Sequence, residues 1–223
     1  MQSPAQHKLA IFNIYNIYRL VLSIILLISF LFGTANSVLG SWDSELFYQI
    51  SSLYLTVNLV IFLAGLTPLK KHFKALHFVT VIIADILVLV LLSYTCGGVS
   101  SGMAHLLIVP IAAGSLLNPG RISIFLAAVG SIAAIYSEIY LYLRISDGND
   151  YYVQAGLLGL TLFIVALAIQ ILGGRIRRNE LLAEEQQARI QNLQEMNFQI
   201  IQRMQSGIIV VDAQGRILNA NSS

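Results

Sequence analysis

The sequence predicts an all-α polytopic membrane protein: six membrane-spanning helices lead into a cytoplasmic coiled-coil-like helix and an incomplete β-hairpin. Of the 223 residues, 57% are hydrophobic and only 11% are charged, whereas soluble domains carry roughly 25% charged residues. Apolar stretches of about 20 residues, the length that crosses a bilayer, recur until Gly174, after which the composition turns polar. We therefore divide the chain into a membrane region, 1–174, a cytoplasmic helix, 175–205, and a terminal segment, 206–223.

Six segments have the composition of membrane spans, and they lie near 18–39, 46–67, 75–94, 104–118, 121–143 and 152–174. The fourth has the weakest pattern because it is short and contains Pro110. It is followed by Asn118-Pro119-Gly120, a sequence typical of a turn. This fourth segment therefore crosses the membrane directly, crosses it at a tilt, or re-enters on the side from which it came.

The distribution of basic residues predicts how the spans are oriented. If the N-terminus is cytoplasmic, Arg144 alone among the basic residues in and beside the spans lies outside. The basic residues then on the cytoplasmic side are Lys8, Arg19, Lys70, Lys71, Lys74, Arg121, Arg175, Arg177 and Arg178. This asymmetry follows the positive-inside rule. We therefore expect a multi-pass protein of the inner membrane with both termini in the cytoplasm.

The loops on the outer side are short, near 40–45, 95–103 and 144–151. Even small domains need some 40–50 residues, so none of these loops forms an extracytoplasmic ligand-binding domain. Any signal must then arrive through the membrane, at its outer rim or from the cytoplasm. The net charge of +2 is too small to indicate a nucleic-acid partner. The single cysteine, Cys96, excludes a disulfide within one chain.

The cytoplasmic helix has the composition of a weak coiled coil. It contains no Gly or Pro and is rich in Glu, Gln, Leu and Arg, which favour helix. Its best heptad register has a polar seam near the membrane and an apolar seam further on. Such a seam suits a marginal parallel homodimer that shifts register, and the other interpretation is a solvated linker helix. The predicted signal relay comprises Gly173, Gly174, Leu193, Asn197 and Ile200.

The terminal segment has the pattern of a β-hairpin. Gly207 ends the helix, residues 208–211 are β-branched, Asp212–Gly215 forms a turn, and residues 216–220 return as a second strand. The run Met204–Asn221, M-Q-S-G-I-I-V-V-D-A-Q-G-R-I-L-N-A-N, resembles the start of a PAS domain. The resemblance implies a PAS domain that is cut off after its first hairpin, without the part that would hold a ligand.

A second resemblance covers most of the chain. Six spans, a helical stalk and a PAS start resemble the N-terminal half of the PilS family, sensor histidine kinases of type IV pilus regulation. The most similar part is Cys96–Gly102 with Leu106, Leu107, Pro110 and residues 112–117. The resemblance implies that the chain senses pilin, or another membrane partner, through its spans. A kinase domain that uses ATP and Mg would then phosphorylate a response regulator.

The chain departs from that family in lacking a catalytic domain. Its histidines are His7, His72, His77 and His105, none of which follows the stalk. We therefore expect no catalytic, cofactor-binding or metal-binding residues here. Two alternatives remain: a small transporter or channel, which would need paired broken helices and several ionisable residues, or a sensor with another output, such as a cyclase.

The loop between the third and fourth spans contains the first candidate site. Gly98-Val99-Ser100-Ser101-Gly102 fits the G-x-S-x-G pattern of hydrolases, but that motif requires a strand-to-helix elbow and a later histidine, so catalysis is not expected. Either the small residues let two spans pack closely, or they receive a partner helix. Ser100, Ser101, Gly102 and Pro110 are therefore candidates for partner binding.

Asp85 is the second candidate, because a carboxylate in the middle of a span is costly and needs a partner. Counting about 1.5 Å per residue places Asn58 of the second span at a similar depth. We predict an Asp85–Asn58 hydrogen bond with Asp85 protonated, and the alternative is a polar contact to a partner protein or an ion. Glu138, near the outer end of the fifth span, is expected to extend towards the headgroups.

Overall fold

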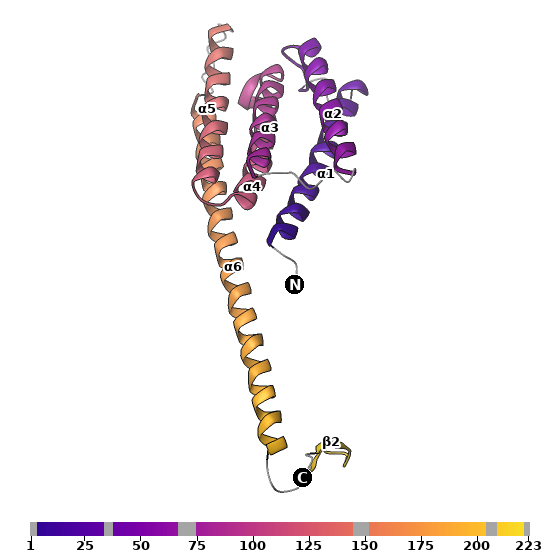
Figure 1. Cartoon of the computed structure of the whole chain (residues 1–223). Helices are drawn as coiled ribbons and strands as arrows, with labels where there is room; N and C mark the ends of the chain where they lie inside the picture. Colours follow the sequence, from indigo (N-terminus) through magenta and orange to yellow (C-terminus); the bar gives the residue numbers. More distant parts are fainter. Residues whose placement is uncertain (1–3, 34–37, 67–74, 145–151, 204–208, 221–223) are drawn as a thin grey trace. The chain divides into compact units, whose positions relative to one another are not determined.

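The computed structural model describes residues 4–33, 38–66, 75–144, 152–203 and 209–220 (Figure 1). The elements, in order, are α1 (Pro4–Leu31), α2 (Ser44–Leu66), α3 (Ala75–Thr95), the 3-10 helices η2 (Gly98–Ser101) and η3 (Met103–Leu107), α4 (Ile108–Leu117), α5 (Arg121–Arg144), α6 (Tyr152–Arg203), β1 (Ile209–Val211) and β2 (Ile217–Ala220). The chain divides into two compact units, Met1–Gly173 and Gly174–Ser223.

Five helices in the described part of the chain are long and apolar enough to cross a membrane. Their apolar segments are Ile11–Leu31, Ser44–Leu63, Phe78–Thr95, Arg121–Arg144 and Tyr152–Ile200, the last of which includes the polar part of α6. The predicted second, third, fifth and sixth spans agree with α2, α3, α5 and the start of α6. The basic loop with Lys70, Lys71 and Lys74, and the outer loop at 145–151, lie outside the described residues.

The predicted first span is misplaced. The prediction begins it at residue 18 and treats Arg19 as a flanking charge, whereas α1 already begins at Pro4. Its apolar segment begins at Ile11 and ends at Leu31. Arg19 therefore lies well inside the span, where its side chain is 4% exposed. The prediction is wrong because a basic residue inside an apolar stretch looks the same in sequence as one that borders it.

The fourth predicted segment is a composite helix. The 3-10 helix η3 leads directly into α4, and together they form a shorter apolar helix, Met103–Leu117. At 2.0 Å per residue in η3 and 1.5 Å in α4, it is about 25 Å long. That length is slightly less than the ~30 Å hydrocarbon core of a bilayer. Asn118–Gly120 then connects α4 to α5, as the turn sequence predicts.

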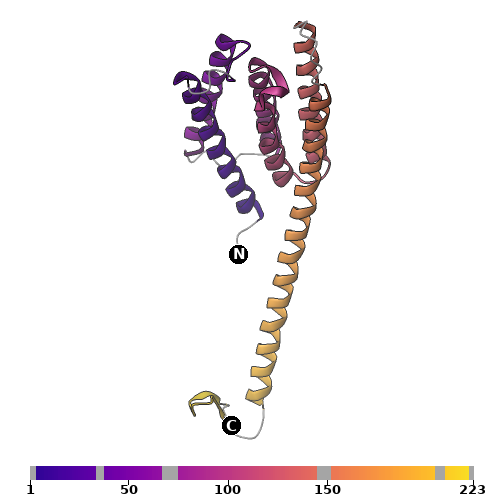
Figure 2. The ribbon, with the colours of Figure 1, turned by 180° about the vertical axis from the view of Figure 1, so that it is seen from behind.

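Helix α3 lies at the centre of the membrane unit. Figures 1 and 2 show α1 and α2 as a pair on one side of α3 and α5 on the other. Helix α3 contacts α2, α4, α5 and both 3-10 helices. Four large apolar side chains on one face of α3 are fully or almost fully buried, namely Ile82, Ile86, Leu89 and Leu92. Most elements of this unit are therefore anchored to one apolar helix.

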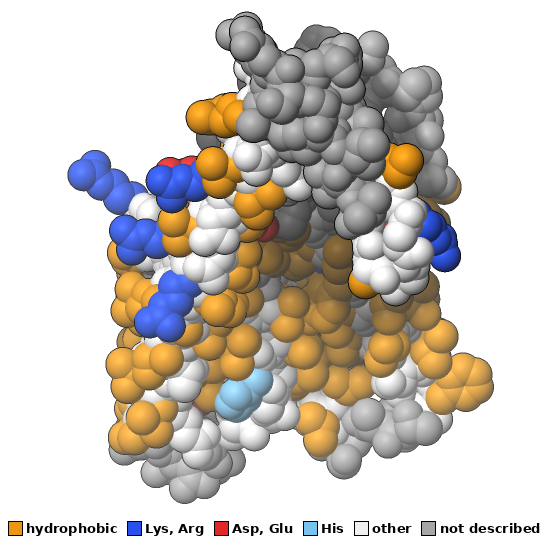
Figure 3. All heavy atoms as spheres, turned by 90° about the horizontal axis from the view of Figure 1, so that it is seen from below, with side chains coloured by type: hydrophobic (Ala, Val, Ile, Leu, Met, Phe, Trp, Pro, Cys, Tyr) orange, Lys and Arg blue, Asp and Glu red, His pale blue; other side chains and the backbone are white. Residues whose placement is uncertain are grey.

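The outer faces of the helices are apolar as well. Ile14 and Leu31 on α1, Val60 on α2 and Leu143 on α5 are each at least 60% exposed. Figure 3 shows hydrophobic side chains over much of the face seen from below. Exposed apolar area on this scale is unfavourable in water but suits contact with lipid, so the bundle has the surface of a membrane protein.

Helix α6 continues without interruption from Tyr152 to Arg203, a length of 52 residues. Gly173 and Gly174 lie inside it, and the boundary between the two compact units falls between them. From Gly174 to Ile200 every residue is exposed within the chain. This part of α6 is therefore a solvated helix whose apolar residues are left exposed by the described part of the chain.

The terminal segment forms the predicted hairpin. Strands β1 and β2 are antiparallel, with Ile209 opposite Ala220 and Val211 opposite Ile217. The carboxylate of Asp212 accepts hydrogen bonds from the backbone N–H groups of Gln214 and Arg216, and Gly215 has a φ of +78°. Asp212 and Gly215 thus form the turn. Gly207, the expected end of the helix, lies outside the described residues.

Candidate functional site

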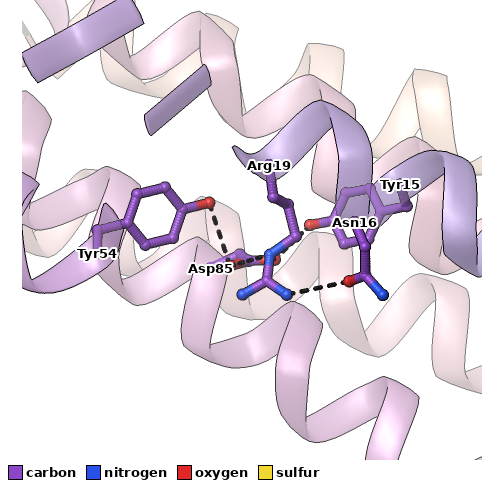
Figure 4. Close-up of polar contacts among 5 residues, drawn as sticks. All are labelled: Tyr15, Asn16, Arg19, Tyr54 and Asp85. Atoms are coloured by element: carbon purple, nitrogen blue, oxygen red, sulfur yellow. Dashed lines mark hydrogen bonds and ion pairs between the residues drawn. The ribbon is translucent and has the colours of Figure 1, made fainter. Parts of the chain in front are cut away.

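A buried ion pair joins α1 and α3 in the middle of the membrane unit (Figure 4). The Nε atom of Arg19 lies 2.8 Å from Oδ2 of Asp85 and donates a hydrogen bond of 2.9 Å to Oδ1. Arg19 is 3% exposed and Asp85 is 1% exposed. The pair thus lies inside the bundle, away from lipid, as ionisable residues within membrane spans almost always do.

Two tyrosines complete the coordination of the carboxylate. Tyr15, one turn before Arg19 on α1, donates to Oδ2 of Asp85 at 2.6 Å, and Tyr54 of α2 donates to Oδ1 at 3.3 Å. Arg19 also donates from Nη1 to the Oδ1 atom of Asn16 at 3.3 Å. Figure 4 shows Tyr15 and Arg19 of α1 and Tyr54 of α2 pointing toward Asp85 of α3, and Asn16 beside Arg19. We call Tyr15, Asn16, Arg19, Tyr54 and Asp85 the mid-membrane cluster.

The cluster gives α3 polar connections to both helices of the α1–α2 pair. A guanidinium remains protonated in proteins, so the Asp85 carboxylate neutralises a charge that cannot be removed in any other way. Breaking such a buried pair is costly because it leaves one charge without a partner. The described residues contain no group of His, Cys, Asp and Glu that could hold a metal. The arrangement therefore suits a structural connection between α3 and the α1–α2 pair.

The predicted Asp85–Asn58 hydrogen bond is wrong, and so is the reason for expecting a protonated Asp85. Asp85 is paired with Arg19, and in the described part of the chain neither amide atom of Asn58 has a hydrogen-bond partner. Asn58 is 3% exposed and lies one turn after Tyr54 on α2. Arg19 is the residue that the sequence reasoning missed. Its position within an apolar run, with an acidic residue inside another span, was the signal that could have identified it.

A second polar cluster lies at the C-terminal end of α3, around Glu138 of α5. Its Oε2 atom accepts a 3.0 Å hydrogen bond from the backbone N–H of Val99, and Glu138 is 3% exposed. The expectation that it extends towards the headgroups is wrong. A Cβ atom on Gly98 would clash with the carboxylate, and the φ of Gly98 is +82°. Glycine therefore lets the backbone turn and approach Glu138 at the same time.

The predicted partner-binding residues of this loop have local roles. The hydroxyl of Ser100 donates to the carbonyl of Gly97, and that of Ser101 donates to the carbonyl of Gly98. Gly102 has a φ of +78° and open space where a Cβ would be. These residues form a 3-10 turn, so the nucleophile elbow of a hydrolase is absent from this described loop. Only Ser100 and Gly102 are exposed.

The same end of α3 also holds the turn between α1 and α2. The backbone N–H of Gly40 points to the sulfur of Cys96 at 3.4 Å, and the hydroxyl of Ser41 donates to the Cys96 carbonyl. The backbone N–H groups of Trp42 and Asp43 donate to the Thr95 carbonyl. Cys96 is 4% exposed, and burial raises the pKa of its thiol. It is thus a packed residue at a helix end.

The remaining predicted residues lie further along the chain. Pro110 is buried in the first turn of α4, where a missing N–H costs no helical hydrogen bond. Gly173 lies near Leu116 of α4. Gln170 of α6 donates to the carbonyl of Gly120 in the α4–α5 turn at 2.8 Å. The other predicted relay residues are all exposed on α6, namely Gly174, Leu193, Asn197 and Ile200.

Comparison with known proteins identifies the family. Residues 1–183 match the PilS-like transmembrane domain family. The chain belongs to this family. Over 213 residues, 96% of its length, it is 38% identical to the sensor protein kinase PilS of Pseudomonas aeruginosa, and it spans 39% of the length of that relative. No solved structure matches it.

The family assignment confirms the resemblance inferred from the sequence. It also confirms the class of protein, a multi-pass protein of the bacterial inner membrane. The family match includes the mid-membrane cluster, Glu138 and the junction at Gln170 and Gly173, since it ends at residue 183. The distal part of α6 and the hairpin lie beyond it.

Proposed function

We propose that this chain is the membrane-embedded signal-input region of a two-component sensor histidine kinase that controls the transcription of type IV pilus genes. The observation that carries the proposal is the 38% identity to a sensor protein kinase over 96% of the chain. The bundle and α6 are the input. Phosphorylation of a response regulator, with the ATP and Mg that it requires, belongs to a kinase domain outside these residues.

The proposed signal is a membrane partner, in the first place the transmembrane helix of pilin. Two features support a partner within the bilayer. The described outer connections are tight turns held by hydrogen bonds, such as Gly40–Asp43 against Thr95 and Cys96. The outward faces of α1, α2 and α5 carry large apolar side chains, which can contact a partner helix as readily as lipid.

In the proposed topology η3 and α4 form a short or tilted fourth crossing, which makes six crossings with both termini in the cytoplasm. Charge supports this orientation. Arg121 begins α5 at the end where α6 continues into Arg175, Arg177 and Arg178, and Arg144 ends α5 at the opposite face. There Arg144 donates to the Tyr140 hydroxyl at 2.9 Å. This is the asymmetry of the positive-inside rule.

The proposed signal path runs from α3 through α4 and α5 into α6. A partner that favours one packing of the bundle would shift the population towards it. The α4–α5 turn contacts α6 through Gln170 and Gly173, so a displacement of this turn acts on the helix just before its solvated part. Because α6 is continuous from Tyr152 to Arg203, a rotation or translation of its membrane part would also move its solvated part.

The solvated part of α6 is proposed to pair with a second copy as a parallel coiled coil. Ile190, Leu193 and Ile200 are each more than half exposed, and they occupy one heptad seam with Asn197. A polar residue in such a seam fixes register at some cost in stability. The hairpin is proposed to be the first element of a PAS domain, which would receive the displacement.

Photo-crosslinking in the membrane tests the proposed partner. A photoreactive amino acid would replace the exposed Leu143 on α5, Val60 on α2 or Ile14 on α1 in the full-length kinase, in cells that express pilin. We expect a pilin adduct from at least one helix face and none from the buried Leu126 position. A promoter–reporter fusion in the same cells should respond to the pilin level. Adducts no more abundant than at Leu126 would contradict the pilin proposal.

A further inference from the structure

The amide of Asn58 is the polar group that the fold leaves unexplained. It is 3% exposed, and neither its nitrogen nor its oxygen has a hydrogen-bond partner in the described part of the chain. An unpaired amide inside a bilayer is costly, because neither lipid nor an apolar side chain replaces its bonds to water. Buried polar groups in folded proteins are almost always paired with protein or with ordered water.

Asn58 borders the mid-membrane cluster. It follows Tyr54 by four residues on α2, so the two side chains share one face of the helix. The Tyr54 hydroxyl donates to Asp85, which also accepts from the Arg19 guanidinium, and no hydrogen bond joins Tyr54 to Asn58. The amide therefore faces a polar region of the bundle and has groups within reach of a small bridging molecule.

The surroundings restrict which molecule this can be. A cation is excluded by the guanidinium of Arg19, and an anion would compete with the Asp85 carboxylate that neutralises it. Tyr15, Arg19, Tyr54, Asn58 and Asp85 are each no more than 4% exposed, so the region is closed off from the surface of the bundle. Water is neutral and small, both donates and accepts, and occupies buried sites that offer two to four polar partners.

We infer that the bundle holds a water site in the middle of the membrane, bridging the Asn58 amide to the Tyr54 hydroxyl and the Arg19–Asp85 pair. The water accepts from the Asn58 amide nitrogen and from an N–H of the Arg19 guanidinium, and it donates to the Asn58 carbonyl oxygen or the Tyr54 oxygen. A local solvent molecule lowers the cost of separating the ion pair, so Asn58 is a positioning residue for that rearrangement. This inference does not depend on the proposed function.

Radiolytic hydroxyl-radical labelling of the full chain in nanodiscs of phosphatidylethanolamine and phosphatidylglycerol tests the site. Radicals form from water, so a buried aromatic ring is oxidised only when water lies beside it. We expect several-fold more labelling at Tyr54 than at Phe47, which is on the same helix and fully buried. With ¹⁸O water, the oxygen added to Tyr54 should carry the heavy isotope.

Two variants localise the water. Asn58→Leu should reduce Tyr54 labelling several-fold and leave Phe47 unchanged. Ser51→Ala is the matched control, because Ser51 is equally buried on α2 and its hydroxyl already donates to the Tyr48 carbonyl, so Tyr54 labelling should stay as it is. Equal labelling of Tyr54 and Phe47 in the unmodified chain, a comparison that needs no variant to fold, would overturn the inference. Unchanged labelling in a folded Asn58→Leu variant would also overturn it.

Discussion

The bundle contains two buried carboxylates, Asp85 and Glu138, which are used in different ways. Asp85 lies in the middle of α3 and is held by side chains from α1 and α2, one of them charged. Glu138 lies in the C-terminal part of α5 and accepts a hydrogen bond from a backbone N–H of a 3-10 turn. The first joins helices far apart in the sequence, and the second holds the backbone of one connection.

The difference shows how position in the membrane determines what a carboxylate requires. At mid-depth lipid offers no hydrogen-bond donors and the helix backbone has no free N–H groups, so Asp85 needs a cation and hydroxyl groups from neighbouring helices. At the edge of the bundle a turn exposes free N–H groups, and a single one satisfies Glu138. Losing a partner should therefore be more costly at Asp85, and the substitutions below test this order.

Asp85→Leu should have the largest effect. It leaves the Arg19 charge buried without a partner, and breaking a buried pair in this way costs about 3–5 kcal/mol. The free energy of unfolding in mixed micelles measures the loss. The double variant Arg19→Leu/Asp85→Leu should regain most of it, because an apolar pair of similar volume needs no counter-charge. A double variant as unstable as the single one would show that the ion pair is not the reason.

Gly98→Ala should rank second and test the Glu138 cluster. Gly98 and Gly102 both have a φ near +80°, so alanine at either costs about 1–2 kcal/mol in backbone conformation. At Gly98 the added Cβ also meets the Glu138 carboxylate, whereas at Gly102 it meets nothing within 4 Å. The midpoint of thermal unfolding should thus fall further for Gly98→Ala. Equal midpoints would indicate that the contact with Glu138 is not close in solution.

The two tyrosines of the mid-membrane cluster should differ from each other. Tyr15→Phe removes a 2.6 Å hydrogen bond to Asp85, and Tyr54→Phe removes one of 3.3 Å. Hydrogen bonds to charged groups contribute about 1.5–3 kcal/mol, and we expect Tyr15→Phe at the upper end of this range and Tyr54→Phe at or below the lower end. Unfolding by denaturant in micelles compares them. The reverse order would mean that Tyr54 is the main hydroxyl partner of Asp85.

Glu138→Gln should have the smallest effect, below about 1 kcal/mol, because the amide oxygen still accepts the Val99 N–H. Glu138→Leu is the matched variant that leaves this N–H unpaired, at a cost of about 1–3 kcal/mol. Hydrogen exchange at Val99, read by mass spectrometry, should rise for Glu138→Leu and stay low for Glu138→Gln. A rise in both variants would mean that the charge of Glu138, and not its hydrogen bond, holds the turn.

The sequence predicts the membrane helices well where apolar length and turn signals agree. The fifth predicted span, 121–143, differs from α5 by one residue, and the hairpin lies where its β-branched residues and Asp-x-x-Gly turn place it. The position of α1 was not predictable in this way. The hydropathy pattern places Arg19 at the edge of the span, because an unpaired charge inside a span would be too costly. Only the pairing with Asp85, which hydropathy does not reveal, makes the interior position acceptable.

The candidate site was predicted in part. Depth counting identified Asp85 as a mid-membrane carboxylate and placed Asn58 near it, but it could not choose between Asn58 and Arg19 as partner. That choice depends on how α1 packs on its neighbours, a long-range contact that one sequence does not specify. The same holds for Glu138, since its hydrogen bond depends on a backbone N–H 39 residues away along the chain, at Val99.

The separation of Arg19 and Asp85 in sequence has a consequence for biogenesis. During synthesis α1 enters the bilayer before α3 exists, so Arg19 at first lacks a counter-charge and raises the cost of insertion by about 2.5–3.5 kcal/mol at the centre of a helix. Pairing with Asp85 removes that cost only after α3 has been inserted. The third helix thus fixes the depth of the first one late in assembly. A chain that failed to place α3 would keep an unpaired charge in lipid, a defect that membrane quality control can detect.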